Sequence, residues 1–219
     1  MIIFFLFISI INLIFQDRTD HWGIRIRRLS KAMIVPCLAS LYLLKAQFPH
    51  HYILLALAFC WLGDLVLMGT YDRTNQVIHE SDRQFLSGLS LFLMGHLFYG
   101  LYFSTLIQIN INHIFNQAAL GLFLLYGTLI IKEVKARGTM LIGTILYSLA
   151  IGAMMLLSIN LFVFHRSMNH FILGLGALLF GSYDTVLAFR DIKKLKMPNT
   201  YVMFSYIAGQ YLIILSLVQ

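Results

Sequence analysis

The stretch FCWLGDLVLMG, residues 59–69, places an aspartate, Asp64, inside an apolar segment that is long enough to cross a membrane. The stretch GALLFGSYDTVLAF, residues 176–189, places a second aspartate, Asp184, inside another such segment. A charged side chain at the centre of a membrane helix costs roughly 2.5–3.5 kcal/mol on insertion scales. Because the whole chain has only nine acidic residues, two such placements indicate a functional site within the membrane.

The composition predicts that the rest of the chain is also membrane-embedded. Of its 219 residues, 59% are hydrophobic and only 11% are charged, whereas soluble domains are nearer a quarter charged. Apolar segments fall at about 1–16, 32–47, 52–70, 84–107, 115–131, 139–163, 170–189 and 200–218. We therefore predict an all-α membrane protein, a single transmembrane helical domain over residues 1–219 that is built as a bundle of eight transmembrane helices.

The basic residues predict an orientation for this bundle. The connections at 17–31, 71–83, 132–138 and 190–199 carry 14 of the 16 lysines and arginines. Cytoplasmic loops are enriched in these residues, so both termini are expected on the non-cytoplasmic side. Scattered through short loops, the net charge of +7 gives no indication of a nucleic-acid partner.

The same orientation predicts the depth of the two aspartates. Each lies five or six residues from the cytoplasmic end of its segment, about 8–9 Å inside the boundary at roughly 1.5 Å per residue. Two carboxylates at one depth can meet across a bundle. Which helices are neighbours does not follow from the sequence.

Four segments in order resemble the YhhN-like lysoplasmalogenase family: WLGDLVL (61–67), FLSGLSLFLMGHLFYGLYF (85–103), GALLFGSYDTVLAF (176–189) and YIAGQYLIILS (206–216). The resemblance covers the chain from Trp61 to Ser216, and Lys31 corresponds to a lysine at the start of the family's second span. Serine precedes the second aspartate in the family pattern, where this chain has Tyr183. Gly95 and Gly209 stand where the pattern has alanine.

The resemblance implies an eight-span enzyme that cleaves the vinyl ether bond of lysoplasmalogens, to a fatty aldehyde and glycerophospho-ethanolamine or -choline. It implies Asp64 and Asp184 as catalytic residues. Residues expected to bind the substrate are Lys31, His96, Tyr99, Tyr183 and Gln210. The implied partners are a lysophospholipid and the lipid bilayer, and no motif indicates a cofactor or a metal ion. The short connections favour a bacterial inner membrane, and the oligomeric state does not follow from the sequence.

Two carboxyl groups suit this chemistry. A vinyl ether hydrolyses when an acid protonates its outer carbon and water attacks the resulting oxocarbenium ion. Glycosidases, which use a pair of carboxyl groups, pass through a similar oxocarbenium-like transition state. Which aspartate is the acid stays open, as do two alternatives. In the first, the aspartates bind protons or cations in a small transporter or lipid-binding protein. In the second, they hold helices together as buried, paired residues.

Overall fold

The computed structural model describes residues 1–68, 78–107, 139–193 and 198–218, with isolated helical residues between 117 and 132. Side chains are described outside 78–83, 139–140 and 188–193. The helices are α1 (Ile2–Ile14), α2 (His21–Lys45), α3 (His51–Met68), α4 (Ile78–Thr105), α6 (Thr139–His165), α7 (Met168–Lys193) and α8 (Asn199–Leu217). These ranges confirm the all-helical prediction. Most of the predicted segment 115–131 lies outside the described residues.

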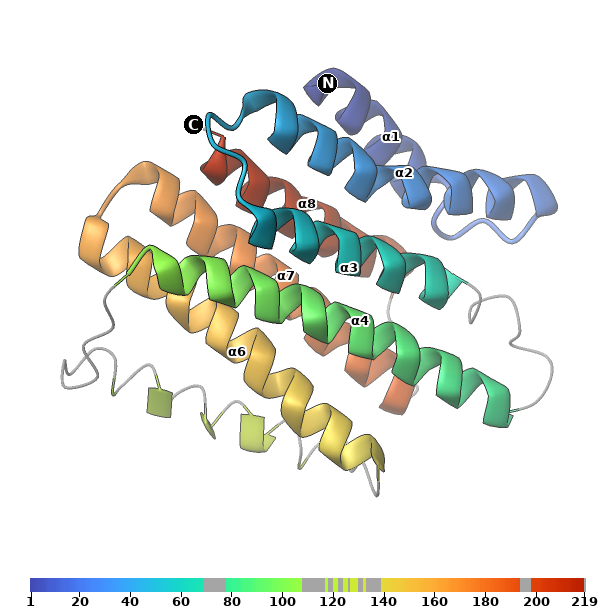
Figure 1. Ribbon diagram of the computed structural model, residues 1–219. Helices are drawn as coiled ribbons and strands as arrows, with labels where there is room; N and C mark the ends of the chain where they lie inside the picture. Colours follow the sequence, from blue (N-terminus) through green and yellow to red (C-terminus); the bar gives the residue numbers. More distant parts are fainter. Residues whose placement is uncertain are drawn as a thin grey trace.

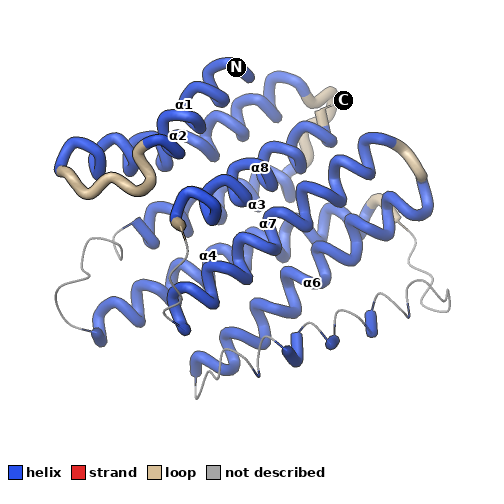
Figure 2. The backbone as a smooth tube through the Cα atoms, turned by 180° about the vertical axis from the view of Figure 1, so that it is seen from behind, coloured by secondary structure: helices blue, strands red, loops and turns tan. Residues whose placement is uncertain are grey.

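The helices lie side by side in one bundle (Figures 1 and 2). Along the chain, α1 packs on α2, α2 on α3, α3 on α4, α4 on α6, α6 on α7 and α7 on α8. Further contacts join α8 to α1 and α2, so residues from the two ends of the sequence meet. The N- and C-termini lie toward the same end of the bundle (Figure 1).

Five of the described helices are long and apolar enough to cross a membrane. They cover His51–Met68, Gln84–Thr105, Leu141–His165, Met168–Leu187 and Asn199–Leu217, and α1 is a shorter apolar helix. The chain is therefore an integral membrane protein by the length and composition of its helices. The count of eight spans and the side on which the termini lie stay predictions.

Helix α2 corrects one predicted boundary. The sequence predicts a connection over 17–31, but the helix begins at His21, where the Asp20 side chain accepts a hydrogen bond of 3.0 Å from the backbone N–H of Gly23. Such N-capping satisfies a backbone donor that the first turn of a helix leaves free. Three arginines and Lys31 are therefore helical rather than in a loop. The prediction placed the boundary too late because the first turns of the helix are polar, and it was based on apolar residues alone.

Two glycines let α7 and α8 approach closely. A Cβ atom added to Gly209 would lie 2.6 Å from the backbone nitrogen of Phe180, and one added to Gly176 would lie 2.8 Å from that of Ile213. Small residues at such crossings are typical of membrane helices. Gly209, one of the departures from the family pattern, therefore allows the α7–α8 contact that positions the residues of both helices.

We expect Gly209→Ala to destabilise the bundle by about 1–3 kcal/mol, because the backbone of α7 has to move to admit the methyl group. The measurement is the apparent melting temperature in detergent. Gly100→Ala is the matched control, since its Cβ atom would meet Leu157 at an unstrained 3.9 Å. Equal melting temperatures for the two variants would contradict the close packing.

Candidate active site

Asp64 is held by side chains from two other helices. It lies on α3 with no exposed surface. The ammonium nitrogen of Lys31 on α2 is 3.1 Å from Oδ1, and the hydroxyl of Tyr206 on α8 donates to Oδ2 at 2.5 Å. A positive charge and a hydrogen-bond donor both stabilise a negative charge that water does not reach.

Asp184 has a separate set of partners. It lies on α7 and is 1% exposed. The Nε2 atom of His96 on α4 is 2.9 Å from Oδ2, and the hydroxyl of Tyr147 on α6 donates to Oδ1 at 2.6 Å. Each predicted aspartate is therefore bound by one basic side chain and one tyrosine.

The contacts of His96 show which of its atoms faces Asp184. Its Nδ1 atom lies 2.7 Å from the carbonyl oxygen of Phe92. Since a carbonyl only accepts, Nδ1 carries a hydrogen. The other ring nitrogen, Nε2, faces Oδ2 of Asp184, and neither atom makes a hydrogen bond among the described residues. The two atoms therefore form a buried place where a proton can be held.

Aromatic rings connect the two centres. The ring of Tyr206, which binds Asp64, lies 4.8 Å from that of Tyr183 and 5.7 Å from that of Phe180. Phe180 stacks on His96 with ring centroids 4.5 Å apart. Phe92, Phe180, Tyr183 and Tyr206 are all at most 2% exposed. Both carboxylates therefore border the same buried aromatic cluster.

Tyr99 on α4 and Gln210 on α8 form a further polar contact. They lie about one helical turn beyond His96 and Tyr206, respectively. The Tyr99 hydroxyl donates to Oε1 of Gln210 at 2.7 Å, and both side chains are fully buried. The thiol of Cys60 on α3 is also fully buried. Gly95 lies beside this thiol, and a Cβ atom there would be 2.6 Å from the Cys60 sulfur. The glycine that replaces the family's alanine thus leaves room for Cys60.

The structure brings most of the predicted site residues into one region. Lys31, Asp64, His96, Tyr183 and Asp184 surround or contact the aromatic cluster. The sequence prediction missed two residues that bind the carboxylates, Tyr147 and Tyr206. Both are tyrosines within apolar segments, and a buried phenol usually has a hydrogen-bond partner. From the sequence, each of these tyrosines could therefore be expected to have a hydrogen-bond partner, but the partner could not be identified.

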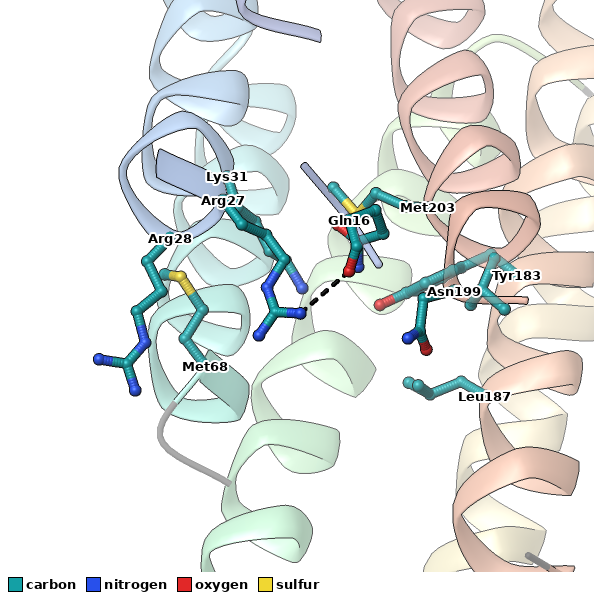
Figure 3. Close-up of a pocket in the computed structure, with 10 residues that line it drawn as sticks. Gln16, Arg27, Arg28, Lys31, Met68, Tyr183, Leu187, Asn199 and Met203 are labelled. Atoms are coloured by element: carbon teal, nitrogen blue, oxygen red, sulfur yellow. Dashed lines mark hydrogen bonds between the residues drawn. The ribbon is translucent and has the colours of Figure 1, made fainter. Parts of the chain in front are cut away.

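A pocket near one end of the bundle has Lys31 and Tyr183 in its lining (Figure 3). It lies between residues of α2, α3, α7 and α8 and includes Arg27, Arg28 and Asn199. We call this end of the bundle, marked by Arg25, Arg27 and Arg28 on α2 and by Asn199 on α8, the basic end. The pocket offers a polar approach to the Lys31–Asp64 pair.

Comparison with known proteins identifies one family. The sequence pattern of the YhhN family matches residues 26–217. The match includes every predicted site residue and both of the tyrosines that bind the aspartates. No curated protein and no solved structure gives a significant match.

Proposed function

The chain belongs to the YhhN family, and from this membership and its two buried carboxylate centres we propose that it is a membrane hydrolase that cleaves the vinyl ether bond of lysoplasmalogens. The products are a fatty aldehyde and glycerophospho-ethanolamine or -choline. The observation that carries the proposal is the His96–Asp184 pair, whose facing atoms are 2.9 Å apart and placed to hold a proton in apolar surroundings near a second carboxylate. Acid-catalysed hydrolysis of a vinyl ether needs such a proton and a stabilised cation.

In the proposed reaction the His96–Asp184 pair is the acid. Its shared proton goes to the outer carbon of the vinyl ether, whose double bond supplies the electron pair, and an oxocarbenium ion forms at the carbon bound to oxygen. Asp64, which contacts Lys31 and Tyr206, stabilises this cation electrostatically in its ionised form.

Water then completes the hydrolysis. It adds to the oxocarbenium carbon and returns a proton to the His96–Asp184 pair, which leaves a hemiacetal. The hemiacetal collapses as its hydroxyl loses a proton, the bond to the glycerol oxygen breaks and that oxygen is protonated. One water molecule is consumed, and the acid is regenerated.

The proposal includes a position in the membrane. The basic end faces the cytoplasm, by the positive-inside rule, so the headgroup enters there and the alkenyl chain lies in the apolar interior. The short connections between helices favour a bacterial inner membrane as the location.

We expect purified protein in detergent to release fatty aldehyde from a lysoplasmalogen without an ion gradient or added cofactor. The control substrate is the alkyl-ether lysophospholipid of the same chain length, which has no double bond to protonate and should stay intact. Absence of aldehyde from the vinyl ether would overturn the proposed hydrolase.

A small proton-coupled transporter or lipid-binding protein is the second candidate, because the same His96–Asp184 pair stores a proton inside a membrane bundle. Proton flux in liposomes that depends on Asp184, without cleavage of the vinyl ether, would favour this alternative.

A further inference from the structure

The pocket at the basic end is lined by cations. Arg27, Arg28 and Lys31 contribute to its wall, and none of the described residues that line it is acidic. Gln16, Tyr183 and Asn199 add polar groups. Such a combination of positive charge and hydrogen-bonding groups is suited to an anion.

Arg27 is fixed in position within this pocket. One guanidinium nitrogen, Nη1, donates to the backbone oxygen of Gln16 at 3.0 Å. Figure 3 shows the guanidinium directed toward Gln16, with Tyr183 reaching from α7 toward the same space. A guanidinium has five N–H donors, so this bond leaves donors for a ligand while it restricts the side chain.

The charges around Arg27 favour an added negative group. Arg27 and Arg28 are adjacent in the chain and repel each other. The acidic residue that acts on Arg27, Asp17, is exposed, and its carboxylate accepts a hydrogen bond from Thr200 at 2.6 Å. An anion in the pocket would reduce the repulsion between the two guanidinium groups.

Lys31 connects the pocket to Asp64, and its ammonium group is engaged by that carboxylate. We propose that the pocket binds the phosphate of a glycerophospholipid headgroup and that Arg27 is its principal anchor, an assignment that rests on the proposed function. Arg27 thus contacts the phosphate, while Lys31, which the family resemblance implies in substrate binding, stays paired with Asp64.

The spacing along α2 agrees with this assignment. Arg27 and Lys31 are four residues apart in one helix and so lie on one face, separated by about 6 Å along the axis. In a lysoplasmalogen the three-carbon glycerol unit separates the phosphate from the ether oxygen. A phosphate at Arg27 therefore directs the vinyl ether past Lys31 toward the carboxylates.

Gln16 provides an independent indication of a ligand. Its side-chain oxygen Oε1 is buried and has no hydrogen-bond donor within the part of the chain that the structure describes. A buried acceptor without a donor is unfavourable. Rotation of the Gln16 side chain toward the pocket would bring this acceptor to the glycerol hydroxyl of a bound lysolipid, beside the phosphate.

The test measures binding rather than turnover. The probes are a saturated 1-O-alkyl-glycerophosphoethanolamine and the matching 1-O-alkylglycerol, which lacks the phosphate, titrated into purified protein in detergent. We expect the wild-type protein to bind the phosphate-bearing probe at least about tenfold more tightly, and Arg27→Gln to remove about tenfold of this preference, as for a lost hydrogen bond to a charged group.

The matched control is Arg25→Gln. Arg25 lies two residues earlier on α2, is exposed, and packs over Trp22 with its guanidinium carbon 5.8 Å from the ring centroid. This variant loses the same charge outside the pocket and should keep the preference. An equal loss in the two variants would show a general effect of charge and overturn the assignment.

Two further outcomes are decisive. Displacement of the lipid probe by inorganic phosphate at the same concentration would assign the pocket to free phosphate and overturn the headgroup proposal. Because both probes resist hydrolysis, a preference that depends on Arg27 supports the phosphate site even if no aldehyde is released. Conversely, aldehyde release with an unchanged preference in Arg27→Gln supports the hydrolase and overturns the site.

Discussion

Replacing Asp184 by asparagine is expected to lower the rate of aldehyde release by about 10²- to 10⁴-fold, the usual contribution of a general acid–base group. The reason is the role of the proposed acid, the pair formed by Oδ2 of Asp184 and Nε2 of His96, which lie 2.9 Å apart. Asparagine has no acidic proton to give to the vinyl ether and cannot receive one from water. The rate is measured as aldehyde formed per mole of purified protein.

Asp184→Asn is also expected to keep the bundle folded. The amide oxygen of asparagine can accept the Tyr147 hydroxyl, which binds Oδ1 in the native protein. Its amide nitrogen can donate to Nε2 of His96, whose Nδ1 hydrogen stays on the carbonyl of Phe92. Both buried partners remain hydrogen-bonded, so the melting temperature and the binding of the saturated ether probe should change little.

Tyr147→Phe is the graded control for this variant. It removes one hydrogen bond to Asp184 but leaves the shared proton, so we expect a loss of about tenfold, in line with a hydrogen bond to a charged group. A rate in Asp184→Asn equal to that of the wild-type protein would show that Asp184 is not the acid. A loss in Tyr147→Phe as large as that in Asp184→Asn would point to a structural role for the whole group.

The two aspartates could be predicted from the sequence because a carboxylate within an apolar segment is rare and costly. His96 was predicted from its place in a family motif. The structure adds the pairing: Asp64 with Lys31, and Asp184 with His96. These pairs join α3 to α2 and α7 to α4, and periodicity along one segment carries no information about which helices are neighbours.

Lys31 and Tyr147 show where the sequence prediction fails for physical reasons. Lys31 follows three arginines and so has the composition of a cytoplasmic loop. The cap at Asp20 nevertheless starts a helix that carries Lys31 to a buried position, where its side chain is 11% exposed. Tyr147 lies in a segment without any recognised motif, and only the crossing of α6 and α7 brings its hydroxyl to Asp184.

Replacing Lys31 by methionine is expected to destabilise the protein by about 3–5 kcal/mol, because the buried carboxylate of Asp64 loses its counter-ion. At roughly 2–4 °C per kcal/mol, the apparent melting temperature should fall by on the order of 10 °C. Lys45→Met is the matched control. Lys45 lies in the last turn of the same helix and is exposed, so its loss should leave the melting temperature nearly unchanged.

The double variant Lys31→Met/Asp64→Asn separates stability from catalysis. It removes both charges together and leaves an amide oxygen to accept the Tyr206 hydroxyl, so we expect most of the lost melting temperature to return. Aldehyde release should stay low, because no negative charge then faces the oxocarbenium ion. If activity returned together with stability, Asp64 would be a structural residue that holds α2 to α3. A double variant no more stable than Lys31→Met would instead show that the ion pair does not determine stability, since removing an uncompensated buried charge must relieve its cost.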